Sequence, residues 1–399
     1  MSRVPDPSTH ERVGDGFGGV NNDGVDFDLG GVVGLRLVDA GAREIAAVTR
    51  QLGSIRRPLA REPDVLVRFV ERLALKGPLR FIGLSDAAFS DDEFLLLRGK
   101  HESRLRVQIP FDQVGGKRCE IVCERGLAAV PMLVPLLNAT LLARGHLPLH
   151  AAAFVHRGRG VVATGWSKGG KTETLLAFMA NGARYVADEW LYLAPGGASM
   201  FGIPEPIRVW NWHLRSLPEL RARLSHGARA RLSLLDFVAG GMSRVTAGGA
   251  RHGSVVTRTL NRASALVENQ LCVDLAPERL FGAAASLNGS PGSSPLWPER
   301  VLFVVSHEHP EISVRPIDPR EVAERMLFSL AEEDQRLTSC YHKFRYAFPG
   351  RTNEFLERAD ERRRTLLHAA LAGKDTFEVR HPYPVSLPEL YRALAEVCG

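Results

Sequence analysis

The sequence has no uninterrupted apolar run of about twenty residues, the length that a helix needs to cross a lipid bilayer. Its first residues, MSRVPDPSTHERVGDGFGG, also lack the basic and then apolar pattern of a secretion signal. We therefore expect a cytoplasmic protein with no membrane partner.

Cysteine is scarce and scattered. The chain has five cysteines, at positions 119, 123, 272, 340 and 398. This odd number without regular spacing predicts reduced thiols rather than a disulfide framework. Cys119 and Cys123 fall on one face of a predicted strand, and no further ligand stands at zinc-finger spacing. We interpret them as half-buried strand thiols.

The chain also lacks a motif that reads RNA or DNA. Its net charge is +6, and arginine outnumbers lysine. A modest positive balance suits an acidic or phosphate-bearing partner, but arginines spread over a globular surface give the same balance. We therefore predict no nucleic-acid partner.

What the sequence does contain is a Walker A pattern, GWSKGGKT, at residues 165–172. The apolar residues 160–164 before it predict a strand, and the apolar spacing over residues 172–180 predicts a helix. A strand before the motif and a helix after it are the context in which this pattern binds a nucleotide. A glycine-rich turn with an accidental Lys-Thr is the alternative.

Each residue type in the motif has a chemical role in that context. Gly165, Gly169 and Gly170 let the backbone turn sharply, so that successive N–H groups converge on a phosphate. Lys171 would reach the β- and γ-phosphates, and the Thr172 hydroxyl would ligate Mg²⁺. The motif thus predicts ATP and Mg²⁺ as ligands.

An acidic pair, Asp188-Glu189, follows within a second apolar segment at residues 184–193. A carboxylate on the strand after the nucleotide-binding helix holds Mg²⁺ or orients the nucleophile. Adjacent strand residues point to opposite faces, so we expect at most one of the two to face the phosphates unless the strand ends there. The alternative is an acidic pair in solvent. His150, among alanines, reads from the residues alone as a packed core histidine.

The segment from His150 to Glu189 resembles the core of the HPr kinase/phosphorylase family and of HPr-kinase-related kinases, including those that phosphorylate lasso peptides. The residues that carry the resemblance are His150, Ser167, Gly170, Lys171, Thr172, Glu173, Gly182, Arg184, Asp188 and Glu189. This combination is far more specific than a Walker motif alone. The resemblance is strongest over residues 149–193 and covers about half of the chain.

The resemblance implies an α/β fold, with a P-loop kinase core of the HPr kinase/PEP carboxykinase type and an N-terminal α+β accessory domain. It implies ATP- and Mg-dependent transfer of the γ-phosphate to a serine hydroxyl of a small protein or peptide. His150, Lys171 and Glu189 fall on active-site positions, with Glu189 as proton acceptor, and Thr172 falls on the Mg²⁺ ligand. The implied nucleotide contacts are Gly165, Trp166, Ser167, Lys168, Gly169, Gly170, Lys171, Thr172 and Glu173.

The chain departs from the family pattern at the acidic pair, which is Asp-Asp in the family and Asp188-Glu189 here. Either carboxylate can therefore be the base, with the other on Mg²⁺. The phosphorolysis segment of the bifunctional enzymes is not recognisable, so we expect a kinase only. Hexamers occur among HPr kinases, which leaves a homo-oligomer open, although no residue pattern specifies a subunit contact. The alternatives are a small-metabolite kinase and a non-catalytic ATP-binding scaffold.

Composition divides the 399 residues into a tail and two domains. Residues 1–31, rich in Gly, Pro, Asp and Asn, predict a disordered tail. Residues 32–128 predict the accessory domain, and residues 129–399, in which strands alternate with helices, predict the catalytic domain. Residues 215–262 gather arginines, and we expect a basic, flexible insertion that either closes over the triphosphate or grips an acidic peptide, or is merely solvated.

Three further predictions concern individual segments of the chain. Residues 129–144 form an apolar helix, kinked at Pro135, that docks the accessory domain on the core. Gly240-Gly241 and Gly248-Gly249 interrupt any long helix in the basic insertion. Glu205 and Arg208 face the nucleotide as a metal ligand and a charge neutraliser, or form a surface ion pair.

Overall fold

The computed structural model describes residues 24–73, 80–81, 87–89, 94–99, 102–248, 270–282 and 296–399. Most of the predicted disordered tail, residues 1–23, lies outside these ranges. Its last part does not fit the prediction, because Val25–Leu29 forms strand β1 and pairs antiparallel with strand β2, Val33–Val38. Phe27 and Leu29 of that strand are buried, which adds apolar contacts to its pairing with β2.

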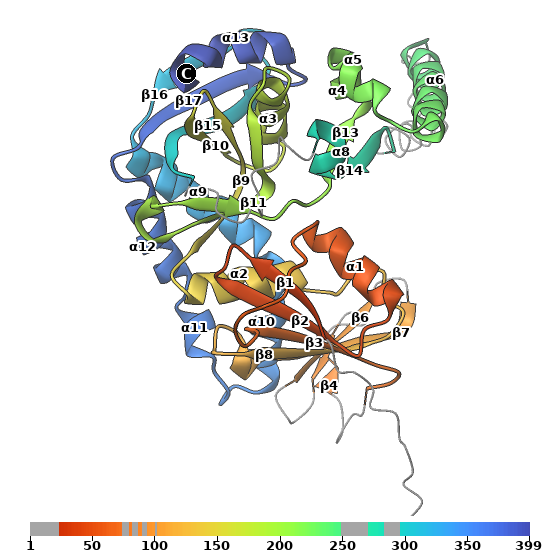
Figure 1. Cartoon of the computed structure of the whole chain (residues 1–399), viewed down its shortest axis with the longest axis vertical. Coiled ribbons are helices and arrows are strands. Elements are labelled where there is room, and N and C mark those ends of the chain that lie inside the picture. Colours follow the sequence, from red (N-terminus) through yellow and green to blue (C-terminus); the bar gives the residue numbers. More distant parts are fainter. Residues whose placement is uncertain are drawn as a thin grey trace, which may run out of the picture.

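The first of two large sheets lies in the lower lobe of Figure 1 and has the order β1-β2-β3-β8-β7-β6-β5-β4. Its other strands are β3 (Val65–Val70), β4 (Arg80–Phe81), β5 (Ala87–Phe89), β6 (Phe94–Gly99), β7 (Glu102–Pro110) and β8 (Cys119–Glu124). β2, β3 and β8 run parallel, and helix α1 (Ala42–Leu52) connects the first two. The predicted presence of both helix and strands in this part of the chain is confirmed.

The second sheet, in the upper lobe, has the order β12-β11-β9-β10-β15-β17-β16. Its strands are β9 (Leu147–His156), β10 (Arg159–Thr164), β11 (Arg184–Leu193), β12 (Met200–Gly202), β15 (Pro298–His307), β16 (Ser313–Pro316) and β17 (Asp375–Pro382). β10, β15 and β17 are parallel, and β9 joins β10 and β11 antiparallel. The predicted mixed α/β class is confirmed by this sheet and its helices.

Helices cover both faces of the second sheet because successive strand residues point to opposite sides. Ala152 and Phe154 of β9 pack with helices α3 (Lys171–Met179) and α13 (Leu387–Cys398). The neighbouring Ala151, Ala153 and Val155 pack with helices α9 (Pro319–Glu333) and α12 (Ala359–Leu371). Asp318 caps α9, its carboxylate accepting from the Arg320 N–H at 2.8 Å. Arg358 separates the short helix α11 (Glu354–Glu357) from α12.

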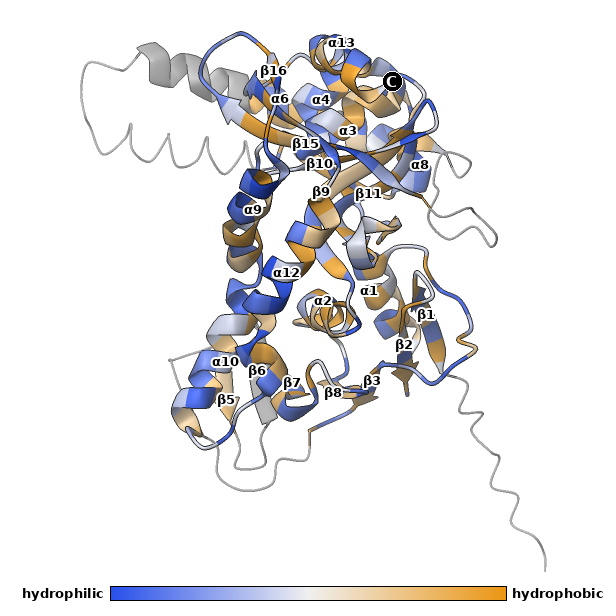
Figure 2. Cartoon of the chain, turned by 90° about the vertical axis from the view of Figure 1, so that its left-hand side faces the viewer, coloured by the Kyte–Doolittle hydropathy of each residue, from blue (hydrophilic) through white to orange (hydrophobic). Residues whose placement is uncertain are grey.

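Helix α2 (Leu133–Ala143) connects the two lobes. It is mainly apolar, as Figure 2 shows, and its leucines are buried with the first sheet. Tyr192 of β11 donates a hydrogen bond to Asn138 of α2 at 2.9 Å, which fixes the helix to the second sheet. The docking role predicted for this helix is confirmed, but the kink at Pro135 is wrong. α2 begins at Leu133, so Pro135 lies in the first turn, where no backbone N–H is needed.

The first lobe also takes a segment from far along the chain. Helix α10 (Gln335–Ala347), which the sequence did not predict, buries Tyr341 and Phe344 with Phe111, the residue that follows β7. The predicted boundary after residue 128 thus separates the two sheets but not the two cores, because α2 and α10 belong to the core of the first.

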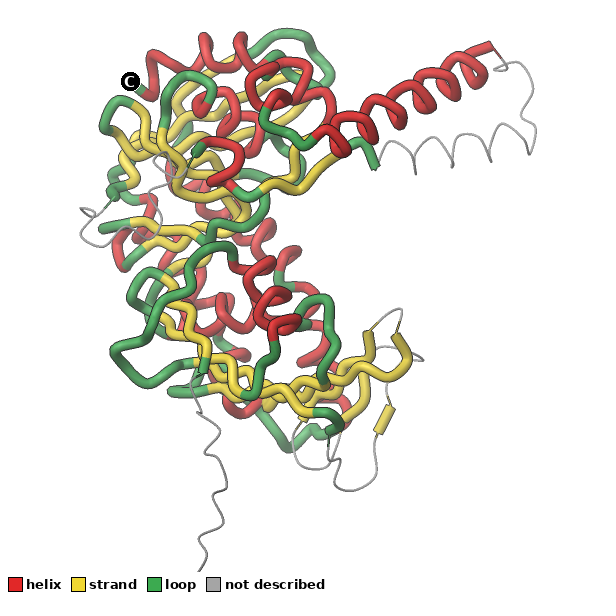
Figure 3. The backbone as a smooth tube through the Cα atoms, turned by 45° about the vertical axis from the view of Figure 1, so that its right-hand side comes forward, coloured by secondary structure: helices red, strands yellow, loops and turns green. Residues whose placement is uncertain are grey.

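A small third unit is inserted after β12. It consists of β13 (Ile207–Trp210), α4 (Asn211–Ser216), α5 (Pro218–Ala222), α6 (His226–Gly248), β14 (Cys272–Leu275) and α8 (Pro277–Phe281). Figure 3 shows α6 extending away from both sheets. Because α6 is continuous through Gly240 and Gly241, the prediction that these glycines interrupt a helix is wrong. Of the predicted basic insertion, residues 249–262 lie outside the described residues.

The predictions about cysteines and membrane spans can be compared with the described residues. All five cysteines lie within it, and none forms a disulfide, as predicted. None of the helices in the described ranges combines the length and the apolar character that crossing a bilayer requires.

Candidate functional site

The site begins at the glycine-rich loop, residues 165–170, between β10 and α3. Gly165 and Gly170 have φ angles of 154° and 109°, which favour glycine. A Cβ at Gly170 would lie 2.0 Å from Nε2 of His381, a buried ring on β17 that also contacts the Gly169 carbonyl at 3.0 Å. The loop is therefore held by a contact with β17, and only glycine fits at its last position.

This close approach gives a testable consequence for stability. Gly170→Ala is expected to lower the free energy of unfolding by about 3 kcal/mol, since the methyl group must displace a buried, hydrogen-bonded ring and the positive φ is strained. Gly182→Ala is the matched control, because Gly182 at the other end of α3 has a φ of 82° with nothing within 4 Å of the added Cβ. It should cost only about 1 kcal/mol. Urea denaturation of the two variants measures the difference; equal losses would contradict the steric argument.

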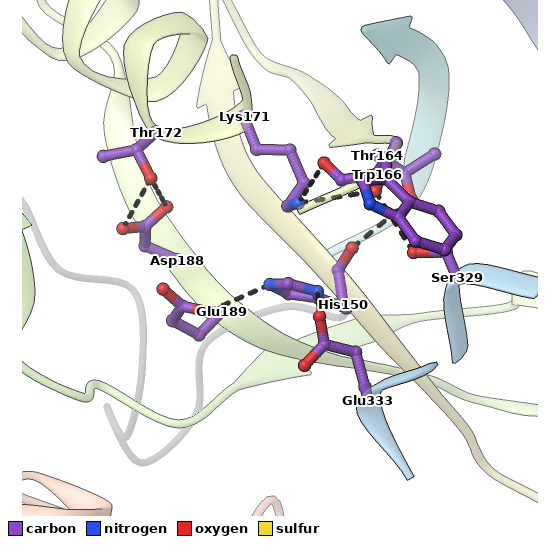
Figure 4. A network of polar contacts seen from close by, with 10 residues as sticks. His150, Thr164, Trp166, Lys171, Thr172, Asp188, Glu189, Ser329 and Glu333 are labelled. Atoms are coloured by element: carbon purple, nitrogen blue, oxygen red, sulfur yellow. Dashed lines mark hydrogen bonds and ion pairs between the residues drawn. The ribbon is translucent and has the colours of Figure 1, made fainter. Parts of the chain in front are cut away.

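Lys171 opens helix α3 with its side chain folded over the loop. Its Nζ donates to the carbonyls of Gly165 and Trp166 at 3.3 and 3.0 Å, as Figure 4 shows. Among the described residues, no carboxylate lies within ion-pair distance of this ammonium group. Burial lowers the pKa of Lys171, while the nearby acidic side chains act in the opposite direction. A buried cation bonded only to neutral carbonyls, above a glycine-rich loop, suits an incoming anion.

The acidic pair lies directly beside this loop. The Thr172 hydroxyl donates to Asp188 at 3.1 Å, and Asp188 is only 3% exposed. Burial, followed by the charge of Glu189, raises the pKa of Asp188 to about 7. The two residues predicted as metal ligands on the Walker helix and the following strand are thus in contact.

Glu189 breaks the strand pattern. Its φ of 117° is unusual for a residue with a side chain. This backbone angle places the Glu189 carboxylate on the same side of β11 as the Asp188 carboxylate (Figure 4). Figure 4 shows the carboxylates of Asp188 and Glu189 next to one another, between Thr172 and His150. The expectation that adjacent residues must face opposite sides therefore does not hold here. Backbone strain of this kind is concentrated at functional sites.

His150 completes the row from strand β9. Its Nε2 lies 2.9 Å from Glu189 Oε2, and its Nδ1 lies 2.7 Å from Glu333 Oε1. The second contact is an ion pair without hydrogen-bond alignment. Burial acts to lower the pKa of His150, but the two carboxylates outweigh it and raise that pKa. The residue is thus part of the acidic site and not merely a packed core histidine.

Glu333, at the end of α9, is the site residue that sequence reasoning missed. No motif surrounds it, and it lies far from His150 along the chain. The only sequence signal is that Glu333 lies at helical spacing from Met326 and Ser329. Met326 contacts the Thr164 hydroxyl at 3.4 Å, and Ser329 contacts the Gly165 carbonyl at 3.4 Å. One face of α9 thus contacts β10, the glycine-rich loop and His150.

Glu205 and Arg208 do not pair with each other in the structure. Arg208 pairs with Asp274 at 3.1 Å, so the predicted ion pair between Glu205 and Arg208 is wrong. Glu205 Oε1 is buried without a hydrogen-bond partner, and burial, with the charges of Glu189 and Asp188, raises its pKa to about 8. Across the described ranges, no three His, Cys, Asp or Glu side chains are arranged to hold a metal by themselves. Glu205 therefore belongs to the acidic site only through its charge.

The remaining loop residues differ in exposure. Trp166, Ser167 and Lys168 are exposed at the tip of the loop, where a ligand can reach them. Glu173 was predicted to contact the nucleotide, but it is buried and pairs with His213 of α4 at 3.1 Å. The Nδ1 of His213 accepts from the Trp210 N–H, so its Nε2 carries the proton and donates to Glu173. Glu173 therefore connects α3 to the inserted unit through its side chain, and a nucleotide contact at this residue stays a prediction.

The raised pKa of Asp188 predicts a pH effect on stability. A buried carboxyl group with a folded pKa above its unfolded one stabilises the fold while protonated, and this contribution is lost as the pH rises through the folded pKa. Without Mg²⁺, the wild type should lose about 2–3 kcal/mol relative to Asp188→Asn between about pH 5 and about pH 8, since one pKa unit corresponds to about 1.4 kcal/mol. Asparagine keeps an acceptor for Thr172. Urea denaturation at the two pH values tests this; parallel pH profiles would contradict it.

Comparison of the chain with models of known protein families and with curated proteins finds no match.

Proposed function

We propose that the protein is an ATP- and Mg²⁺-dependent kinase that transfers the γ-phosphate to a serine hydroxyl of a small protein or peptide, with a P-loop core of the HPr kinase type. The observation that carries this proposal is the row Thr172, Asp188, Glu189 and His150 beside the glycine-rich loop and Lys171. A phosphate-binding loop alone would support nucleotide binding. A half-exposed carboxylate beside that loop, which can accept a proton from a hydroxyl group, supports phosphate transfer.

The loop supports the nucleotide part of the proposal. A positive end of α3 and a buried ammonium group without a carboxylate partner both favour the phosphates of ATP. Lys171 would leave the carbonyls of Gly165 and Trp166 and neutralise the charge that develops on the transferred group. The excess of acidic side chains nearby is consistent with a bound cation.

The acidic side chains suit Mg²⁺ that is bound partly by the protein and partly by water and phosphate, rather than an ion bound by protein ligands only. Mg²⁺ commonly uses one or two carboxylates and completes its shell with water and substrate phosphates. Thr172 and Asp188 would hold the ion, with the partnerless carboxylate oxygen of Glu205 nearby. When bound, Mg²⁺ neutralises phosphate charge and fixes the phosphate geometry.

Glu189 is the better candidate for the base. It is about half exposed, with a side-chain exposure of 48%, whereas Asp188 is enclosed and committed to Thr172. In the proposed step the seryl oxygen bonds to the γ-phosphorus, the bond to the β-phosphate oxygen breaks, and the seryl proton passes to Glu189. His150 holds Oε2 of Glu189, leaving Oε1 for the hydroxyl.

The test combines the purified protein with γ-labelled ATP, Mg²⁺ and a cell extract, followed by mass spectrometry. A peptide or small protein that gains one phosphate on serine supports the proposal. Label on a small metabolite would identify a metabolite kinase instead. Binding of ATP without ADP formation for any acceptor would support a non-catalytic scaffold.

A further inference from the structure

We propose that Glu333 is a positioning residue, which holds the His150 ring so that its Nε2–H faces the base Glu189. This inference rests on the proposed function and adds a residue that no motif contains. The imidazole lies between two carboxylates, with 2.7 Å from Nδ1 to Glu333 and 2.9 Å from Nε2 to Glu189. Figure 4 shows the three side chains in a row.

Glu333 is suited to this role because its helix is fixed at that end. Ser329, one turn earlier, donates to the Gly165 carbonyl, and α10 follows immediately after Asp334. Asp334 is buried and pairs with Arg363 of α12. The end of α9 is therefore attached to both the glycine-rich loop and a neighbouring helix. A carboxylate on such an end holds its partner in one place.

The charges around His150 show what Glu333 contributes. The ring faces Glu189 on β11, Glu333 on α9 and Lys171 on α3, and Glu205 acts from the segment after β12. Burial and the Lys171 charge both favour the neutral ring, and the carboxylates favour the charged one. A neutral imidazole has a single N–H, and rotation of that ring would bring a lone pair against Glu189. Glu333 removes this alternative, because its negative charge beside Nδ1 favours the doubly protonated ring, in which Nε2 carries a proton.

The expected result for the reaction is a loss in rate rather than in nucleotide binding. Glu333→Gln keeps the shape and removes the charge, and it should lower kcat about 10-fold; Glu333→Leu should lower kcat about 100-fold. The KM for ATP should change less than kcat, since Glu333 contacts His150 directly and acts on Lys171 only through its charge. Glu332→Gln is the matched control, because Glu332 is an exposed neighbour on the same helix.

A double-mutant cycle tests whether Glu333 acts through His150. Glu333→Leu should have no further effect on kcat in a His150→Gln background. A second loss of similar size in that background would overturn the proposal. Urea denaturation of each variant identifies losses that come from unfolding alone.

A readout independent of activity is the NMR titration of His150, assigned by the loss of its signal in His150→Gln. The pKa of His150 should fall in Glu333→Gln and stay unchanged in Glu332→Gln. An unchanged titration would contradict the proposed pairing. If the wild type transfers no phosphate to any acceptor but the titration shifts, the kinase assignment fails while the His150–Glu333 pairing stands.

Discussion

Lys171→Ala is expected to reduce phosphate transfer about 1,000-fold or more. The side chain donates to two carbonyls of the glycine-rich loop, and among the described residues its ammonium group has no carboxylate within ion-pair distance to retain it. Removal of one preorganised donor at a developing charge costs about 100- to 1,000-fold, and loss of a full positive charge should cost at least the upper value. The initial rate of label transfer from ATP measures the effect.

Two companion variants make this result specific. Lys171→Met keeps most of the buried side-chain volume, so it separates loss of charge from loss of packing. Lys117→Ala removes an exposed lysine from the first lobe and should leave the rate unchanged. Full activity in both Lys171 variants would mean that the phosphates bind elsewhere.

Glu189→Gln should lower kcat by about 100- to 10,000-fold, the range associated with loss of a general base. The amide cannot take the seryl proton, but it occupies the same space and can still accept from the His150 Nε2–H. The KM for ATP should change little, because Glu189 acts on the acceptor. Steady-state kinetics with saturating acceptor measure both constants, and Glu332→Gln again serves as the control.

The same experiment assigns the acidic pair. Asp188→Asn should instead weaken the Mg²⁺ dependence, so a higher Mg²⁺ concentration should restore part of its rate. If Glu189→Gln responded to Mg²⁺ while Asp188→Asn did not, the two carboxylates would have the opposite roles.

The parts of the site that the sequence predicts are those set by local patterns. An apolar run, a glycine-rich turn and helical spacing follow one another within residues 160–180, and the structure has β10, the loop and α3 there. The acidic pair follows on the next strand, β11, where a second apolar run places it. These interactions lie within short stretches, so periodicity and turn chemistry suffice.

What the sequence did not predict depends on tertiary contacts or on one unusual backbone angle. Glu333 reaches His150 from a helix that follows an entirely different strand, and Glu173 turns to a histidine in the inserted unit. The positive φ of Glu189 has no signature in its neighbours. Likewise, Gly240 and Gly241 reduce helix propensity by about 1 kcal/mol each, which did not prevent a 23-residue helix from forming.

The return of α10 to the first lobe has a consequence for any attempt to divide the chain. A fragment that starts after residue 128 would retain Tyr341 and Phe344 but lose Phe111, the ring against which both pack. The amide of Asn353 would also lose the Val114 carbonyl, to which it donates at 2.9 Å. Such a fragment would expose an apolar helix surface and self-associate. The upper sheet and its phosphate loop can therefore be isolated in soluble form only if the apolar surfaces of both α2 and α10 are made polar or removed.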